Sequence, residues 1–345
     1  MKYSILLITG GAGFIGSNLA VIFKRKYSNL TVIALDNLKR RGSEHNLLRL
    51  KENGVRFIHG DIRNPEDLVF NFNLDLMIEC SAEPSVVAGL ANPVYIINTN
   101  LNGTLNCLEV CRKHKADIVF LSTSRVYPYQ AINKIKSIET DTRFEWLING
   151  INEEFNILGP KTLYGATKLS SELLVQEYVA NYGIKGVINR CGVVSGPWQF
   201  GRVDQGVFTY WMLAHYFKKP LKYLGFGGKG KQVRDLLSTN DLFRLIDLEV
   251  SKLSEISGNI YNVGGGREIS LSLLEATFIC QKLTGNKINI GKDLKTRPGD
   301  ISVYLTDNKK VSKDLSWSPE DSVNMILRNI HSWVRKNEKA LKHLL

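Results

Sequence analysis

The chain has 345 residues, of which 43% are hydrophobic and 23% are charged, and its formal net charge is +12 at pH 7. This composition is typical of a globular protein with one domain of ordinary size and a smaller second domain. No apolar run reaches the roughly 18 residues of a membrane-spanning helix, so we expect no membrane partner. The five cysteines are odd in number and include no C-x-x-C pair, which favours a reducing, cytoplasmic location.

The positive charge permits two interpretations. A nucleic-acid-binding protein would gather its basic residues on one face or in one tail. Here they are dispersed along the chain, with small groups at 39–41 and 229–231. We therefore expect no nucleic-acid partner, and a basic surface that attracts an anionic small substrate.

The first half of the chain alternates apolar strands with amphipathic helices. The strands are nearly continuous apolar runs, which indicates that both faces of their sheet are covered. This alternation predicts the α/β class, with a Rossmann-type doubly wound parallel sheet. Strands are expected at 5–10, 31–36, 55–61, 75–80, 117–123 and 186–191, and helices at 13–26, 93–114 and 163–183.

From Val193 onward the pattern loosens into loops and short elements rich in Trp, Gly and Lys. We expect a smaller mixed α/β domain there, whose loops lie over the carboxyl ends of the sheet and bind the substrate. The predicted division is 1–192 and 193–345, with room for chain exchange between the two domains. Helices are expected at 205–217, 240–253, 271–284 and 321–336.

A glycine pattern directly follows the first strand and opens the first helix, at Gly10, Gly13 and Gly16. These glycines allow a tight turn in which the helix N-terminus binds a pyrophosphate. Asp36 ends the second strand about 20 residues further on, where a carboxylate binds ribose hydroxyls and repels a 2′-phosphate. The pattern therefore predicts NAD(H) rather than NADP(H), although Arg40 and Arg41 lie close by. Asp61 is placed to meet the adenine together with Ile62.

Tyr164 and Lys168 are four residues apart in a predicted helix, so their side chains share one face. A nearby ammonium favours the phenolate and lowers the pKa of a tyrosine from its usual value of about 10. Tyr164 is then a base for a sugar hydroxyl near neutral pH. Ser122 and Thr123 stand at the carboxyl end of a strand, where open α/β sheets bind ligands. Together these residues predict a catalytic group of Thr123, Tyr164 and Lys168.

The stretch GFGGKGKQ at 225–232 nearly matches the phosphate-binding P-loop, G-x-x-x-x-G-K-[ST]. Gln232 stands where that loop requires a hydroxyl that binds Mg²⁺, and the stretch does not join a buried strand to a helix. We therefore expect neither an NTPase nor a metal site. The glycines look like a flexible turn between strands, with Lys229 and Lys231 in solvent.

Five short motifs occur along the chain: TGGAGFIG at 9–16, the strand-end Asp36, NTNLNGT at 98–104, STSRVY at 122–127 and YGATK at 164–168. Together they resemble the extended short-chain dehydrogenase/reductase family of nucleotide-sugar enzymes, over essentially the whole chain. The resemblance implies an enzyme that holds NAD, with Thr123 and Tyr164 at the chemistry. The implied cofactor contacts are Gly10, Gly13, Phe14, Ile15, Gly16, Asp36, Asn37, Asp61, Ile62, Asn100, Ser122, Tyr164, Lys168 and Val193.

The residues after the catalytic threonine narrow the implied chemistry. Dehydratases of the family carry Asp-Glu there, whereas this chain has Ser124 and Arg125. This difference favours redox epimerisation or a one-way reduction. QFGRVDQGVFTYW at 199–211 and GKGKQVRDLL at 228–237 look closest to the CDP-tyvelose (CDP-paratose) 2-epimerases, which use NAD to invert C2 of a CDP-linked dideoxyhexose.

The resemblance also implies the substrate contacts. Arg234 would bind the substrate pyrophosphate through its planar fork, and Arg297 would be a second substrate-binding arginine. Further implied contacts are Glu83, Ser124, Arg125, Gln199, Arg202, Gln205 and Gln232. Glu83 lies in CSAEP at 80–84, where the family usually has H-x-A-A-Q, so it could contact the sugar or cap the following turn. The segment 144–160 could form a lid beside the site.

Several alternatives stay open. The same residues would serve a UDP-hexose 4-epimerase or a nucleotide-sugar keto-reductase. A non-catalytic dinucleotide sensor is a further alternative, but it would have no need of the poised phenolate at Tyr164. In the family, the helix that carries this tyrosine commonly pairs with its copy in a partner subunit, so a homodimer or homotetramer is expected.

Overall fold

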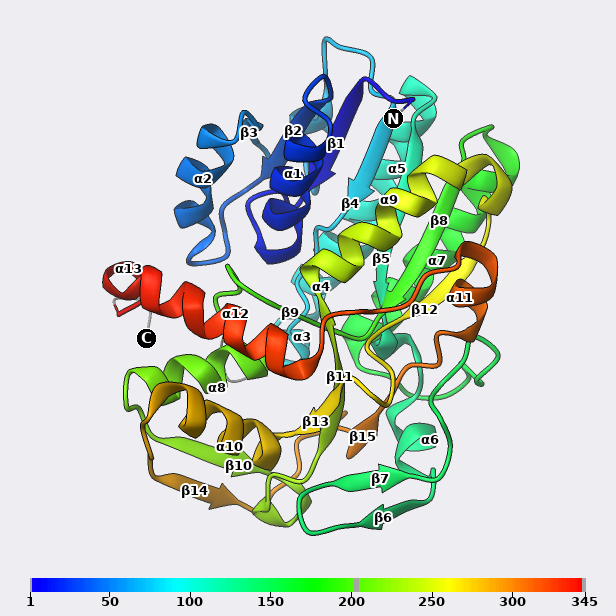
Figure 1. Ribbon diagram of the computed structural model, residues 1–345. Helices are drawn as coiled ribbons and strands as arrows, with labels where there is room; N and C mark the ends of the chain where they lie inside the picture. The colour runs from blue at the N-terminus through cyan, green and yellow to red at the C-terminus, as the bar shows by residue number, and fades with distance from the viewer. Residues whose placement is uncertain (1, 202–204, 343–345) are drawn as a thin grey trace.

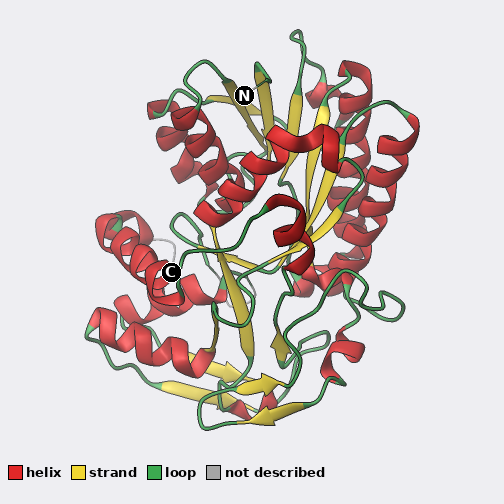
Figure 2. Cartoon of the chain, turned by 45° about the vertical axis from the view of Figure 1, so that its right-hand side comes forward, coloured by secondary structure: helices red, strands yellow, loops and turns green. Residues whose placement is uncertain are grey.

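The structure, a computed structural model, describes residues 2–201 and 205–342. Figure 1 shows a large sheet flanked by helices, which contains the N-terminus, and a smaller part below it that is built mainly from the second half of the chain. Figure 2 shows that the helices lie on both sides of the strands of the large sheet.

The large sheet contains β1 (Ile5–Thr9), β2 (Thr31–Asp36), β3 (Arg56–His59), β4 (Leu76–Glu79), β5 (Asp117–Thr123), β8 (Gly186–Cys191) and β12 (Ile260–Val263). These seven strands are all parallel, in the order β12-β8-β5-β4-β1-β2-β3. The chain reverses its direction of winding between β1 and β4, which leaves room for a ligand at the carboxyl ends of the strands. The predicted Rossmann-type fold is confirmed.

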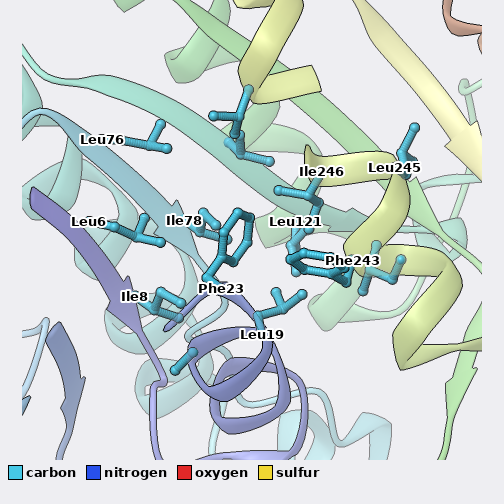
Figure 3. Packing of buried hydrophobic residues seen from close by; sticks show 14 of the residues in the cluster. Leu6, Ile8, Leu19, Phe23, Leu76, Ile78, Leu121, Phe243, Leu245 and Ile246 are labelled. Atoms are coloured by element: carbon cyan, nitrogen blue, oxygen red, sulfur yellow. The ribbon is translucent and has the colours of Figure 1, made fainter. Parts of the chain in front are cut away.

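Helices cover both faces of this sheet. On one face lie α1 (Phe14–Lys26) and α9 (Thr239–Ile256), and on the other lie α5 (Gly103–His114) and α7 (Leu163–Asn181). Leu6 and Ile8 of β1 point to the first face, where the rings of Phe23 and Phe243 meet at 4.8 Å (Figure 3). Leu7 points to the second face, because successive residues of a strand alternate. This double coverage explains the continuous apolar runs of the strands.

The smaller part has its own buried core. Its elements are β9 (Val193–Ser195), α8 (Val207–Tyr216), β10 (Leu221–Leu224), β11 (Val233–Ser238), β13 (Ser270–Ser272), α10 (Leu273–Thr284), β14 (Ile290–Asp293), β15 (Val303–Tyr304) and α12 (Val323–Lys336). β11 is the central strand, which pairs with β13, β15 and β9. Helix α10 begins at a capping box in which Ser272 and Glu275 bond each other's backbone N–H groups. Trp211, Leu213 and Leu327 lie buried between these helices.

The remaining elements connect these layers. They are η1 (Ser43–His45), α2 (Asn46–Glu52), η2 (Pro65–Leu68), α3 (Val86–Ala91), α4 (Pro93–Ile97), η3 (Asn98–Asn102), η4 (Ser124–Val126), α6 (Tyr129–Asn133), β6 (Ser137–Glu139), β7 (Phe144–Trp146), η5 (Phe226–Gly228), α11 (Lys309–Leu315) and α13 (Glu338–Lys342).

Two features differ from the expected elements. The stretch 93–114 is not one regular helix, because the π-helical turn η3 lies between α4 and α5. The second half of the chain does not stay in the smaller part, since α9 packs on the large sheet and β12 pairs with β8. Helix α11 packs on β12 and α9 as well, so from β11 onward the chain passes to the large sheet twice and returns to the smaller part twice.

The segment 144–160 is tied to the body of the protein. The N–H of Ile151 donates to Leu305 O at 2.8 Å, and its carbonyl accepts from Asn262 Nδ2 at 2.9 Å. Glu153 accepts the N–H of Asn262 at 2.6 Å. Trp146, which ends β7, is 2% exposed. These bonds fix the segment beside β12 and β15, which is not the arrangement of a free lid.

Candidate active site

The turn between β1 and α1 brings the backbone closest to a ligand. Gly10 has a φ of +63°, and a β-carbon on Gly16 would lie 2.2 Å from the carbonyl oxygen of Gly10. Larger residues are therefore excluded from this turn. Helix α1 begins after Gly13 with Phe14 and Ile15, and the N–H groups of its first turn have no partner within the helix. A pyrophosphate fits this position, since it would supply the acceptors and meet the positive end of the helix dipole.

Asp36, the last residue of β2, is buried against the glycine turn. Its carboxylate accepts the N–H of Ala12 at 3.1 Å and the N–H of Leu38 at 2.8 Å. Burial raises the pKa of Asp36, and these backbone donors oppose that shift. The side chain therefore holds the turn in shape and lies at the strand end where a ribose-binding carboxylate is expected.

Asp61 lies beside the same strand end. Asn37 Nδ2 donates to Asp61 Oδ2 at 2.9 Å, and Arg63 forms a 2.5 Å ion pair with it. The hydrogen bonds from Arg63 hold the pKa of Asp61 well below its usual range. Ile62 is buried, and its side chain lies where a β-carbon on Gly103 would be 2.5 Å away. The structure thus brings the expected adenosine contacts together.

Asn100 lies fully buried in the π-helical turn η3. Its Oδ1 accepts the N–H of Glu83 at 2.8 Å, and its Nδ2 donates to Glu83 O at 3.2 Å and to Thr167 Oγ1 at 3.3 Å. The Glu83 carboxylate accepts the N–H of Ser85, so it caps the turn before α3. Asn100 therefore fixes the loop after β4 against α7. Irregular π-helical turns such as η3 are frequent at functional sites.

Gln205 links the two loops that border this part of the site. Its Nε2 donates to Glu83 Oε1 at 2.9 Å, and its Oε1 accepts from Arg40 Nη1. Arg40 Nη2 also donates to Phe200 O at 3.2 Å, so this arginine contacts the second half of the chain. Arg202, an expected substrate contact, lies outside the described residues.

Thr123 and Tyr164 come together where β5 ends and α7 begins. Thr123 is the last residue of β5, and its Oγ1 accepts the N–H of Arg125 at 3.2 Å. Tyr164 is in the first turn of α7, which Thr162 caps by accepting the N–H of Gly165 at 3.3 Å. The Thr123 hydroxyl is within hydrogen-bonding reach of the Tyr164 phenol.

The surroundings of Tyr164 shift the pKa of its phenol in the opposite direction to the one expected. Burial raises the pKa of Tyr164 to about 12, while the Thr123 hydroxyl and the positive charge of Arg125 oppose this shift. The prediction that the pKa of Tyr164 lies below its usual value is therefore wrong, since burial outweighs the groups that favour the phenolate. Arg125 is a nearby cation that counters the effect of burial.

The Lys168 ammonium is directed toward the end of β4. Its Nζ lies 3.8 Å from Glu79 Oε2 and 3.8 Å from the centroid of the Phe120 ring. Lys168 is 1% exposed and Glu79 is fully buried. Burial raises the pKa of Glu79, and the Lys168 charge opposes that shift. Our sequence analysis missed Glu79, although an acidic residue that ends the apolar run LMI was a usable signal.

The Ser122 side chain is hydrogen-bonded to Glu172 of α7. Its hydroxyl donates to Glu172, which forms a 2.7 Å buried ion pair with Arg190. Arg190 Nη1 donates to the Tyr127 hydroxyl at 3.1 Å, and this hydroxyl donates to Asn262 Oδ1 at 2.8 Å. The Ser122 side chain therefore belongs to a buried polar network, and its backbone is the part left to line a cofactor.

Two of the expected substrate arginines contact one turn of the chain, residues 297–301. Arg125 Nη1 donates to Gly299 O at 2.9 Å. Arg234 Nη2 donates to Ile301 O at 2.7 Å and lies 3.1 Å from Asp300 Oδ1. Burial lowers the pKa of the Arg234 guanidinium, the negative charge of Asp300 opposes that shift, and the positive charge of Arg125 adds to it. These two cations are therefore neighbours, and an anionic ligand between them would relieve their repulsion.

The remaining residues expected to contact the substrate or the cofactor lie at other positions around the site. Arg297 lies at the start of that turn, where its carbonyl accepts the N–H of Asp300 at 3.1 Å. Ser124 begins η4 beside the catalytic threonine. Gln199 bonds Val194 O and the Thr209 hydroxyl, and Gln232 donates to Leu224 O. Both glutamine amides thus bind their own part of the chain, and Val193 is the first residue of β9.

The near P-loop at 225–232 is a turn between β10 and β11, as expected. The side chain of Lys229 is 54% exposed, so this lysine is solvated as predicted, whereas Lys231 is 13% exposed and is not. Both contact Glu139 Oε1 at 2.8 Å. Glu139 stands on β6, about 90 residues earlier in the chain, where the β6–β7 hairpin lies beside this turn.

The described residues contain no group of three His, Cys, Asp or Glu side chains that could hold a metal ion. The five cysteines are all free, and Cys107 and Cys111 lie in the core as their shared helix face predicts. Between residues 2 and 342, leaving out 202–204, no helix is long and apolar enough to cross a bilayer.

Comparison with known proteins gives a family match, two similar relatives and a similar solved structure. The NAD dependent epimerase/dehydratase family matches residues 6–264. The CDP-paratose 2-epimerase of Salmonella typhi is 33% identical over 95% of this chain and 98% of its own length. The UDP-glucuronate 4-epimerase of Thermodesulfobacterium geofontis is 29% identical over 98% of each chain. The structure of UDP-glucuronic acid 4-epimerase from Bacillus cereus, in complex with UDP-glucuronic acid and NAD, is 27% identical and has a TM-score of 0.80 over 96% of this chain and 99% of that chain.

Proposed function

The chain belongs to the NAD dependent epimerase/dehydratase family, and from that premise we propose that it inverts C2 of a CDP-linked dideoxyhexose. The observation that carries this proposal is the meeting of Thr123 and Tyr164 beside the guanidinium groups of Arg125 and Arg234. A hydroxyl, a phenol and two cations at one strand end suit a substrate that has a reacting hydroxyl and a pyrophosphate.

The residues at the other strand ends fit NAD. The glycine turn leaves space and N–H donors for a pyrophosphate, and Asp36 stands at the end of β2 for the ribose. Bound NAD would supply the hydride acceptor and donor.

The protein residues then handle the proton. Tyr164 takes the proton of the sugar hydroxyl while Thr123 holds the same oxygen, and a keto sugar results. Lys168, on the same helix face, compensates the charge of the phenolate. The keto sugar turns its other face, is reduced there, and receives the proton back from Tyr164. No net oxidation occurs, so turnover consumes no oxidant or reductant.

The choice of sugar rests on similarity. The Salmonella typhi relative is named for C2 of CDP-paratose, and Ser124-Arg125 replaces the acidic pair that a dehydratase would carry after its threonine. A second candidate is a 4-epimerase on a UDP-sugar, which the relative from Thermodesulfobacterium geofontis and the Bacillus cereus structure favour.

An NMR time course of the purified protein with CDP-paratose or CDP-tyvelose, with no added cofactor, tests the proposal. Interconversion of the two sugars is the expected result, and Tyr164→Phe should abolish it while bound NAD is retained. No change with either CDP-sugar, followed by epimerisation of UDP-glucose or UDP-glucuronate, would replace C2 with C4. An unaltered rate in Tyr164→Phe would remove this residue from the chemistry.

A further inference from the structure

Glu79 is a buried carboxylate to which the reaction above gives no role. It ends β4, is fully buried, and places Oε2 3.8 Å from Lys168 Nζ. Thr104 Oγ1 donates to the same oxygen at 3.3 Å. The Lys168 ammonium also lies 3.8 Å from the Phe120 ring centroid, so a carboxylate and a ring face together hold this cation.

Such an arrangement is costly for a core position. Within the described part of the chain, Glu79 Oε1 has no hydrogen-bond partner. The other residues of β4 are Leu76, Met77 and Ile78, so an apolar side chain would suit the packing at this strand end. The carboxylate is therefore better explained by the cation that it faces than by stability.

Glu79 also acts on the phenol one helical turn away from Lys168. Tyr164 and Lys168 share a face of α7, and the negative charge of Glu79 adds to the burial that disfavours the Tyr164 phenolate. The Glu79 carboxylate thus holds the ammonium that shares a helix face with the phenol.

We propose that Glu79 is a positioning residue that fixes the Lys168 ammonium at the end of β4 and thereby sets the pH at which Tyr164 begins to act as a base. The inference rests on the proposed function in one respect, that Tyr164 is the base, and it does not depend on which sugar reacts. The titratable and charged groups that face the pair or Tyr164 come from α5, α7, β8, η4 and the loop after β4: Cys107, Cys111, Tyr164, Cys191, Arg125 and Cys80.

The test follows the ionisation of Tyr164 itself. Protein labelled with ¹³C at the tyrosine Cζ is titrated by NMR from neutral pH to about pH 10.5, and the Tyr164 signal is the one missing from Tyr164→Phe. In Glu79→Gln this signal should move toward the tyrosinate position about one pH unit earlier than in the parent. Glu79→Asp, which keeps the charge, should restore most of the parent behaviour.

The matched control is Glu249→Gln, since Glu249 of α9 is another fully buried carboxylate, paired with Asn189 of β8 at 2.8 Å. It should leave the Tyr164 titration unchanged. An unchanged titration in Glu79→Gln, or an equal shift in both variants, would overturn the proposal. If Glu79→Gln does not fold, Thr104→Val should move the titration in the same direction by less, and no movement would overturn it. Because no substrate is present, failure of the proposed sugar chemistry does not affect this result.

Discussion

The backbone oxygen of Arg125 fills the space that a side chain at Gly165 would need, since a β-carbon there would lie 2.0 Å from it. The first turn of α7 therefore touches η4 backbone to backbone. This contact places Tyr164, the residue before the glycine, beside Thr123, the residue before η4. The absence of a side chain at Gly165 thus allows the Tyr164 phenol and the Thr123 hydroxyl to lie close together.

Gly165→Ala should separate these two elements. Because a misplacement of about 1 Å in a catalytic group costs on the order of 10²-fold in rate, we expect kcat to fall by about that factor. Gly89→Ala is the matched control, since a β-carbon at Gly89 would meet nothing nearer than 3.5 Å. Steady-state kinetics give kcat for both variants. Equal kcat values in the two variants would contradict the role of Gly165 in placing Tyr164.

The buried ion pair of Glu172 and Arg190 should matter for stability. Glu172→Gln leaves the Arg190 charge without its partner and leaves one oxygen where two accept hydrogen bonds from Ser122 and Arg190. We expect the free energy of unfolding in urea to fall by about 3–5 kcal/mol. Glu109→Gln breaks the exposed pair with Arg112 and should change stability little. A small loss in Glu172→Gln would show that the network is not coupled to folding.

Glu249 should make the free energy of unfolding fall as the pH rises from 4.5 to about 8. Burial raises the pKa of this carboxyl from 4.5 to about 8. The folded state therefore holds the proton more tightly than the unfolded state, and its contribution is complete below pH 4.5 and lost as pH rises to about 8. The slope is at most about 1.4 kcal/mol per pH unit in that window. Melting temperatures of the parent and of Glu249→Gln should converge at low pH, with the variant the more stable at high pH.

Arg234→Lys should weaken substrate binding. The guanidinium bonds Ile301 O and Asp300 through Nη2 and Val233 O through Nη1, whereas an ammonium is a point charge that cannot keep this planar arrangement. We expect KM for the nucleotide sugar to rise about tenfold, with kcat nearly unchanged. Arg267→Lys alters an arginine that bonds Trp146 O and Ile148 O instead, and its KM should match the parent. A fall in kcat alone would place Arg234 in the chemistry.

Exposed leucines on α5 and α7 predict self-association. Leu105 is 37% exposed and Leu173 is 57% exposed, on helices that lie side by side on one face of the sheet. We infer that a second copy covers them in a homodimer, so Leu105→Glu with Leu173→Glu should sediment as a monomer. Leu294→Glu changes a leucine that is 70% exposed in the smaller part, and it should leave the sedimentation coefficient unchanged. A parent protein that already sediments as a monomer would refute the inference.

Local patterns predicted much of the site. The glycine turn, Asp36 and the four-residue spacing of Tyr164 and Lys168 each depend on neighbours within one or two elements, and the structure places each at the end of a parallel strand or at the start of a helix. The fold class followed from the same strand and helix alternation.

Local patterns did not predict how burial shifts a pKa or which residues far apart in the chain come into contact. The raised pKa of Tyr164 depends on desolvation, which helix spacing does not contain. The partner of Lys229 and Lys231 stands on β6, and the cation-holding role of Glu79 depends on β4 and α7 meeting. These contacts join residues far apart in the chain, so a single sequence offers no pattern for them.

The position of β12 has a consequence for how the protein is made. This strand, Ile260–Val263, completes the edge of the large sheet, but it is synthesised after β9, α8 and β11 of the other part. Until it emerges from the ribosome, the edge of β8 has unpaired N–H and C=O groups next to a fully buried run. A nascent chain or a fragment that ends at residue 192 therefore exposes a sheet edge that can recruit foreign strands, and the two parts must mature as one unit.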